Sequence, residues 1–175
     1  MSTRTLTLTA VLAALCCLLG PVTLPIGPVP LSLTTGVLMG MALILGARQA
    51  CLCCGVYLML GLLGVPVFSG FTGGLGVLLG PTGGFLLAYL PLTAWSGFAC
   101  ARTYDRRTQA LALIAGTLLL YGVGTAWYAK LSGTSFASAL AVCALPFLPG
   151  DALKITAVLI GGNAIKSRLQ KAGLR

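Results

Sequence analysis

No charged residue occurs between Arg48 and Arg102, and this stretch constrains the fold more than any other feature of the chain. A water-soluble domain usually has about 25% charged residues, spread along its length. This chain of 175 residues has 7%. Its 11 basic and 2 acidic residues are too few to cover a protein of this size in water. The sequence therefore predicts a polytopic membrane protein whose surface faces hydrocarbon.

Six membrane-spanning helices are predicted from the way proline, glycine and basic residues divide the apolar sequence. A hydrocarbon core of about 30 Å is crossed by about 20 apolar helical residues. Residues 135–145 are apolar but too few to cross, so we expect a short extra helix before the last span. The whole chain, residues 1–175, is expected to form a single all-α transmembrane domain, with spans at residues 6–20, 33–47, 49–64, 84–101, 109–130 and 151–167.

Basic residues indicate the orientation, because Lys and Arg are enriched in cytoplasmic loops. If both termini lie in the cytoplasm, nine of the 11 basic residues lie on the inner side, and only Lys130 and Lys154 lie on the outer side. We therefore expect a multi-pass protein with cytoplasmic N- and C-termini.

Most enzyme classes are excluded because the chain lacks their residues. It has no histidine, and its acids are Asp105 and Asp151. Without histidine and with two acids, the chain lacks the residues for the usual metal sites, for paired-carboxylate catalysis and for Ser/His or Cys/His nucleophiles. We therefore expect no metal, no cofactor and no catalytic residue. Residues 160–167 have Ile160 and Ile165 at the two positions where a phosphate-binding loop needs glycine, so the chain is not its own ATPase.

Two further functions are disfavoured by the residues that surround their motifs. The seven cysteines lie in or beside apolar runs, and Cys51 and Cys54 form a C-x-x-C motif without nearby charge. We interpret them as small apolar packing residues. The net charge of +9 is not gathered into basic clusters interleaved with aromatic residues, so no nucleic-acid partner is expected.

Asp151 and Lys154 are the strongest candidates for function, because an ionisable residue at membrane depth is costly. Three residues apart, they share one face of a helix that starts near Asp151. Lys154 would hold a ligand carboxylate, while Asp151 would accept hydrogen bonds from ligand N–H groups or orient the lysine. Alternatively, they form a self-contained ion pair that caps a helix at the outer interface. The spacing supports both interpretations equally.

Aromatic residues and small residues offer weaker candidates. Five aromatic side chains near glycine-rich turns would line a pocket, or would serve as packing and interfacial residues, which is the commoner role. Small residues at Ala10 and Ala14, and at Gly36 and Gly40, allow helices to approach closely, either inside the protein or against a membrane partner. The aromatic residues are Phe68, Phe71, Phe85, Tyr89 and Trp95.

Four ordered blocks of sequence resemble one family closely. The chain is similar to the BioY family, the biotin-specific substrate-binding S components of energy-coupling factor (ECF) transporters. The blocks are residues 25–33 (PIGPVPLSL), 64–68 (GVPVF), 73–76 with 80–86 (GGLG and GPTGGFL) and 146–154 (PFLPGDALK).

The resemblance implies a six-helix, S-component-like bundle in a bacterial cytoplasmic membrane. It would bind biotin near the extracellular side, and membrane lipid would surround it. Family members occur as subunits of a complex with an ECF coupling protein and two ATPase subunits, and are also encoded without them. The resemblance therefore implies these partners, with Ala10 and Ala14 as the docking face, and leaves open action without the ATPase module. The biotin-binding residues that it implies are Asp151, Lys154, Phe68, Gly73, Gly74, Thr82, Gly83, Gly84, Tyr89 and Thr34.

Two positions depart from the family pattern inside these blocks or beside them. Thr34 stands where family members commonly have glutamine, and Phe85 stands where they often have tyrosine. The shorter hydroxyl of Thr34 would weaken or reroute a contact that glutamine makes. Three rival functions remain: an S component for another vitamin, an intramembrane enzyme that uses Asp151 and Lys154 as acid and base, and an assembly subunit without a ligand.

Overall fold

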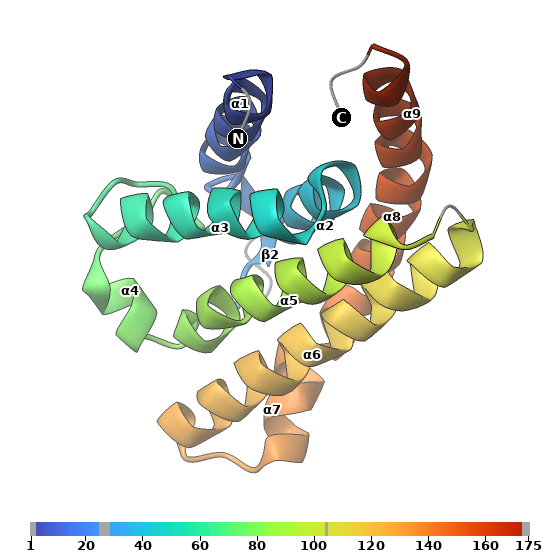
Figure 1. Cartoon of the computed structure of the whole chain (residues 1–175). Helices are drawn as coiled ribbons and strands as arrows, with labels where there is room; N and C mark the ends of the chain where they lie inside the picture. Colours follow the sequence, from blue (N-terminus) through green and yellow to red (C-terminus); the bar gives the residue numbers. More distant parts are fainter. Residues whose placement is uncertain (1–2, 25–28, 104, 173–175) are drawn as a thin grey trace.

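The structure, a computed structural model, describes residues 3–24, 29–103 and 105–172. It is almost entirely helical (Figure 1). Residues 25–28, which open the first sequence block, and Arg175, one of the basic residues expected on the inner side, lie outside the described part.

The helices follow one another with short connections. A two-stranded antiparallel hairpin pairs β1 (Thr23–Leu24) with β2 (Leu31–Ser32) between the first two helices. The α-helices are α1 (Thr3–Leu19), α2 (Thr34–Leu45), α3 (Ala47–Leu62), α4 (Leu75–Leu79), α5 (Gly83–Ala101), α6 (Arg106–Ser132), α7 (Phe136–Cys143), α8 (Leu148–Ala157) and α9 (Asn163–Lys171).

The last three segments of the chain form one continuous rod. A π-helical turn, η2 (Val158–Gly162), joins α8 directly to α9. A 3-10 turn, η1 (Leu145–Phe147), connects α7 to the start of this rod. We refer to residues 148–171 as the terminal rod.

Helices are found at all six predicted spans, and α7 is the short helix expected before the last one. The terminal rod begins at Leu148 and not at Asp151, because Pro149 lies in its first turn, where a helix tolerates proline. The sequence analysis did not predict the β1–β2 hairpin, α4 or the π-turn. The membrane limits of each span stay predictions.

Three helical segments of the described chain are long and apolar enough to cross a membrane, namely Gly83–Ala101, Arg106–Ser132 and Phe136–Leu169. Three shorter apolar helices accompany them, at Leu6–Leu19, Thr34–Leu45 and Ala47–Leu62. Many large apolar side chains on these helices are exposed, as expected of a surface that faces lipid.

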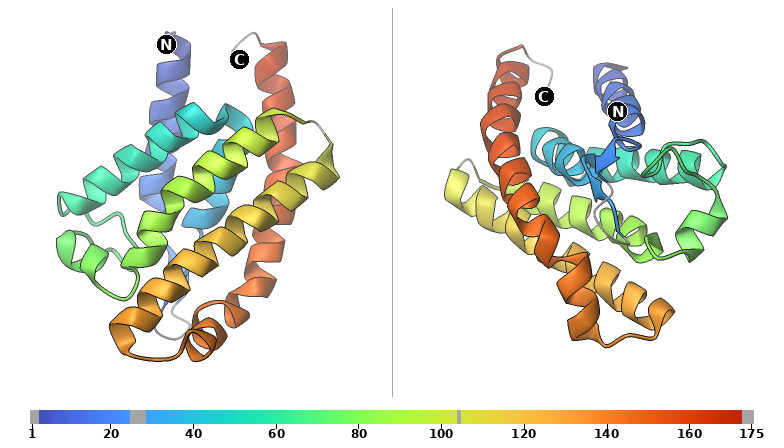
Figure 2. Two further views of the ribbon diagram at one scale, coloured as in Figure 1. Left: turned by 60° about the horizontal axis from the view of Figure 1, so that its bottom comes forward. Right: turned by 180° about the vertical axis from the view of Figure 1, so that it is seen from behind.

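Helix α5 occupies the middle of the bundle and packs against α2, α3 and α6 (Figure 2). Small residues allow these close crossings. A Cβ atom on Gly97 would lie 2.5 Å from the backbone of Ala47, and one on Gly116 would lie 2.8 Å from Ser96 Oγ. The core is therefore built where helix backbones approach one another without intervening side chains.

The start of α6 lies in the short turn that follows α5. Asp105 caps the helix, because its carboxylate accepts hydrogen bonds from the Thr108 hydroxyl at 2.8 Å and the Thr108 backbone N–H at 3.0 Å. The side-chain bond, followed by the backbone bond, lowers the pKa of Asp105. This turn lies toward the same end of the bundle as the start of α1 and the end of α9 (Figure 2).

Candidate functional site

A cavity of about 370 Å³ lies among the hairpin, α2, α5, α6 and the start of the terminal rod. The segment between α3 and α5 covers it and contributes Ser69, Thr72, Val77 and Gly80. The other side is formed by Phe147 in η1 and by Asp151 and Lys154 in α8. The cavity therefore gathers residues from most of the chain at one site.

The Asp151–Lys154 pair forms the polar part of the cavity wall. Lys154 Nζ lies 2.8 Å from Asp151 Oδ1 and donates a second hydrogen bond to Thr35 Oγ1 at 3.0 Å. The Tyr121 hydroxyl of α6 donates to Asp151 Oδ2. The side chains of Lys154 and Asp151 are 11% and 7% exposed, so the pair is buried and does not reach out to the membrane interface.

The network leaves one hydrogen-bond donor, on Lys154, for a ligand. Both oxygens of Asp151 have a partner, one in Lys154 and one in Tyr121. An ammonium group has three N–H donors, and two of those of Lys154 are used within the described residues. The third is left for a hydrogen-bond acceptor inside the cavity.

The rest of the wall is mainly apolar and aromatic, with Phe68, Phe85, Tyr89 and Phe147 among its residues. The Phe68 ring packs edge-on against Tyr57, with ring centroids 5.6 Å apart. An apolar cavity with a few converging polar groups is typical of a small-molecule site.

Two glycines allow the Phe68 and Phe85 rings to pack closely against neighbouring helices. A Cβ atom on Gly61 of α3 would lie 2.1 Å from the Phe68 ring, and one on Gly124 of α6 would lie 2.4 Å from the Phe85 ring. Each ring can therefore approach the backbone of a neighbouring helix closely, and the cavity keeps the volume that the rings would otherwise fill.

Gly61→Ala is expected to push the Phe68 ring into the cavity and to weaken ligand binding about tenfold, since overpacking costs about 1–3 kcal/mol. Gly55→Ala is the matched control, because it lies on the same helix and its Cβ would meet no atom within 4 Å. Dissociation constants of both variants, measured by isothermal titration, check the prediction. Equal binding by the two variants would contradict it.

Five residues of the predicted set line the cavity, namely Asp151, Lys154, Phe68, Thr82 and Tyr89. The structure thereby brings together residues that lie up to 86 positions apart in the sequence.

Four predicted glycines do not line the cavity, and local packing explains each of them. A Cβ on Gly73 would lie 2.4 Å from Val65 O, one on Gly83 would lie 1.7 Å from Leu78 O, and one on Gly84 would lie 2.2 Å from Trp127 Cβ. Gly74 has a φ of +93°, which favours glycine. These glycines lie outside the cavity wall and allow close packing, or a positive φ, in the segments beside it.

Thr34 is also not in the cavity wall. Its hydroxyl pairs with Ser32 Oγ and is fully buried. The next residue, Thr35, faces the cavity and holds Lys154, because successive residues of a helix point about 100° apart. Phe85, the other departure from the family pattern, does line the cavity.

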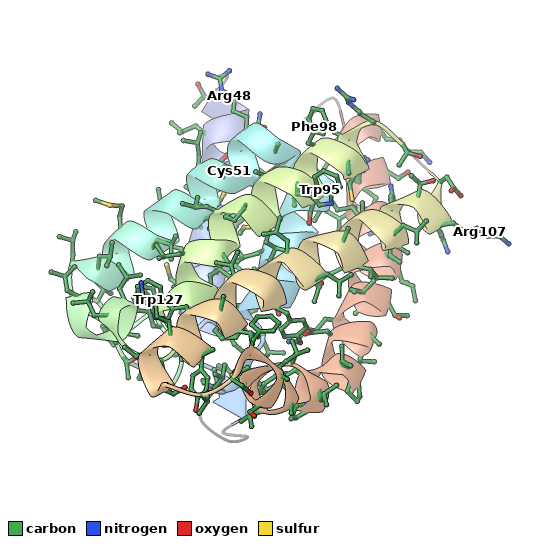
Figure 3. The ribbon with its side chains drawn as sticks, turned by 90° about the horizontal axis from the view of Figure 1, so that it is seen from below. Arg48, Cys51, Trp95, Phe98, Arg107 and Trp127 are labelled. Carbon is green, nitrogen blue, oxygen red and sulfur yellow. The ribbon has the colours of Figure 1, made fainter. Side chains whose placement is uncertain are left out.

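The remaining candidates from the sequence lie elsewhere. Neither Phe71 nor Trp95 lines the cavity. Phe71 is 70% exposed, and Trp95, labelled in Figure 3, donates from Nε1 to Ala112 O at 3.2 Å. Ala10 and Ala14 are exposed on α1. In contrast, Gly36 and Gly40 pack inside the protein against the terminal rod.

Sequence reasoning missed Thr35, Tyr121 and Phe147. Tyr121 lies in the middle of a predicted span and has no charged neighbour to mark it. A polar side chain at the centre of an apolar helix was the one available signal, since such groups need a partner when buried.

Comparison with known proteins agrees with this architecture. The model of the BioY family matches residues 1–171. This chain belongs to the BioY family. One BioY relative, named "Biotin transporter BioY2", from Lactococcus lactis subsp. cremoris (strain MG1363), is 37% identical over 91% of this chain and 88% of its own length. The "Biotin transporter BioY" of Rhizobium etli is 33% identical over 94% of each chain.

A solved BioY-like structure shows the same fold. It is described as the crystal structure of "the S-component for biotin from an ECF-type ABC transporter", and it matches with a TM-score of 0.88, 27% identity and 95% coverage of both chains. The predicted fold class is thereby confirmed: the chain is an all-α membrane protein with an S-component-like bundle.

Proposed function

We propose that this protein captures biotin and carries it across the bacterial cytoplasmic membrane as the substrate-specific component of an ECF-type transporter. The observation that carries the proposal is the buried network of Asp151, Lys154, Tyr121 and Thr35 in the wall of an apolar cavity. The relatives named as biotin transporters, which cover most of the chain, support the same ligand.

The chemistry of biotin suits this cavity. Biotin has an apolar thioether ring, a ureido group with two N–H donors and a C=O acceptor, and a carboxylate tail. The aromatic wall would enclose the rings, since ligand sites of about 300–1,000 Å³ bury most of a small ligand. The free N–H of Lys154 would hold the carboxylate, and Asp151 would orient the lysine.

The protein acts as a binding and transport component and not as an enzyme. An intramembrane enzyme would need Asp151 and Lys154 to exchange protons with a substrate, whereas both oxygens of Asp151 are held by protein donors. Biotin recovered chemically unaltered after incubation with the protein is the expected result.

Both termini are proposed to lie in the cytoplasm, and the cavity would then open toward the outside. The exposed Arg48, Arg102, Arg106 and Arg107 follow or precede helix ends, and Figure 3 shows Arg48 and Arg107 pointing away from the bundle. Basic residues of this kind favour the cytoplasmic side. The start of α1 and the end of α9 lie at the same end of the bundle as the α5–α6 turn, and α7 lies at the opposite end (Figure 2).

The exposed face of α1 is proposed to dock the ECF coupling protein, which would connect the chain to two ATPase subunits. Ala10 and Ala14 lie one turn apart on this face and leave the helix backbone open to close approach.

Equilibrium binding to the detergent-purified chain tests the proposed function. Biotin is expected to bind tightly, its methyl ester at least about tenfold more weakly because a charge-assisted hydrogen bond is lost. Desthiobiotin lacks the thioether bridge and tests the apolar wall. Riboflavin, thiamine and lipoate are expected not to compete. Competition by one of them, or a lack of saturable biotin binding, would reject biotin as the ligand.

A further inference from the structure

The terminal rod carries two similar pairs of residues, one on each side of its π-turn. Asp151 and Lys154 belong to the sequence DALK, and Asn163 and Lys166 belong to NAIK, twelve residues later. The turn Val158–Gly162 lies between them. Its backbone bonds join residues five apart, so it takes up one residue more than an α-turn.

This extra residue decides which face of the rod each pair occupies. In a regular α-helix, residues twelve apart are rotated by about 120° from each other. Because the π-turn takes up one residue, the rotation becomes about 20°. Asn163 and Lys166 therefore lie on the face of the rod that carries Asp151 and Lys154.

The second pair is anchored to the α5–α6 turn. Asn163 Nδ2 donates to Gln109 Oε1 at 2.7 Å and to the Leu159 carbonyl of the π-turn at 2.9 Å. Gln109 is fully buried, and its Nε2 donates to Thr103 O at 3.0 Å. Lys166 Nζ donates to Cys100 O at 3.2 Å.

Two polar contacts thus join the terminal rod to α6. Asp151 meets Tyr121 at the cavity, and Asn163 meets Gln109 at the other end. The partners are twelve residues apart on both helices, which corresponds to about 18 Å along α6. The Asn163–Gln109 contact therefore fixes the position and rotation of the rod at a distance from the ligand site.

Beside the cavity, the part of α2 that faces the terminal rod is a glycine surface, whereas farther along Leu43 of α2 contacts Gly162. Lys154 lies over Gly36, where a Cβ would be 3.4 Å from Lys154 Cγ, and Val158 lies over Gly40. A glycine surface has no side-chain ridges to interlock with the rod. The polar contacts of Lys154 with Thr35 and of Asp151 with Tyr121 constrain the rotation at the cavity, and the Asn163–Gln109 contact constrains it at the far end.

We propose that Asn163 is a positioning residue for the ligand-binding pair: through Gln109 it holds the terminal rod at the rotation that directs Lys154 into the cavity. The inference rests on the proposed function, because its effect is read in biotin binding. Asn163 itself lies outside the cavity wall.

The test compares Asn163→Ala in two backgrounds by measuring the dissociation constant for biotin. In the parent chain we expect binding to weaken about tenfold, the size of one lost hydrogen bond of about 1.4 kcal/mol. In a Lys154→Gln background, which keeps amide N–H donors, we expect less than about a twofold change, because Asn163 acts through Lys154. Ser167→Ala, an exposed change on the same helix, is the control and should leave binding unchanged.

A double variant that exchanges the amide residues Gln109 and Asn163 provides a second test. Gln109→Asn combined with Asn163→Gln keeps the same total side-chain length and is expected to recover most of the binding. If Asn163→Ala does not fold, the milder Asn163→Ser is measured with the same expectation.

The outcomes separate the two proposals. An equal loss in both backgrounds would mean a general structural role and would overturn the positioning role while the function stands. Unchanged binding by Asn163→Ala would overturn it too. A parent chain that does not bind biotin would overturn the proposed function itself, and this inference with it.

Discussion

Lys154→Ala is expected to weaken biotin binding at least about a hundredfold. The change removes a charge-assisted hydrogen bond, which contributes about 1.5–3 kcal/mol. It also leaves the carboxylate of Asp151 facing the carboxylate of the ligand without the cation that separates them. The two effects act in the same direction, so their sum exceeds the loss of the hydrogen bond alone. Isothermal titration of biotin in detergent measures it directly.

Lys130→Ala is the matched control for this prediction. Lys130 is an exposed lysine that the proposed orientation places on the same outer side. Its removal changes the net charge equally but touches no cavity residue. Unchanged binding by Lys154→Ala would reject its role, whereas equal weakening by both variants would indicate a general effect of charge.

Asp151→Ala is expected to destabilise the ligand-free protein by about 3–5 kcal/mol, because it leaves Lys154 buried without its counter-ion. The double variant Asp151→Leu with Lys154→Met should recover most of that stability, since it removes both charges and keeps the volume. Neither variant is expected to bind biotin.

Thermal unfolding followed with a thiol-reactive dye measures this difference. Five described cysteines are buried in the folded protein and would react on unfolding, namely Cys16, Cys53, Cys54, Cys100 and Cys143. A double variant as unstable as Asp151→Ala would contradict the prediction, because it would show that the pair stabilises the fold and is not retained for binding.

The sequence is sufficient to predict the six long helical segments and to single out Asp151 and Lys154, because long charge-free runs and a charged pair inside such a run have few interpretations. Asp151 and Lys154 were found by their cost in a membrane, before any geometry was known. The four glycines stay predictions as ligand contacts. The structure places them outside the cavity wall, where Gly73, Gly83 and Gly84 allow close packing, and that packing depends on backbone geometry that the sequence does not specify.

Register could not be predicted. Thr34 and Thr35 are the same residue type at neighbouring positions, and only the rotation of α2 decides that Thr35 binds Lys154. Tyr121 likewise meets Asp151 because of how α6 crosses the terminal rod. The π-turn has no signature in Val158–Gly162 that would distinguish it from an ordinary turn of apolar helix.

The mutual neutralisation of Asp151 and Lys154 has a consequence for how a ligand reaches the cavity. Among the described residues that line it, these two carry the charges, and they lie 2.8 Å apart. At distances much greater than this separation their fields cancel, so the empty cavity exerts no long-range electrostatic pull on an anion. The pair itself therefore adds no long-range steering of the ligand, and its discrimination begins at contact.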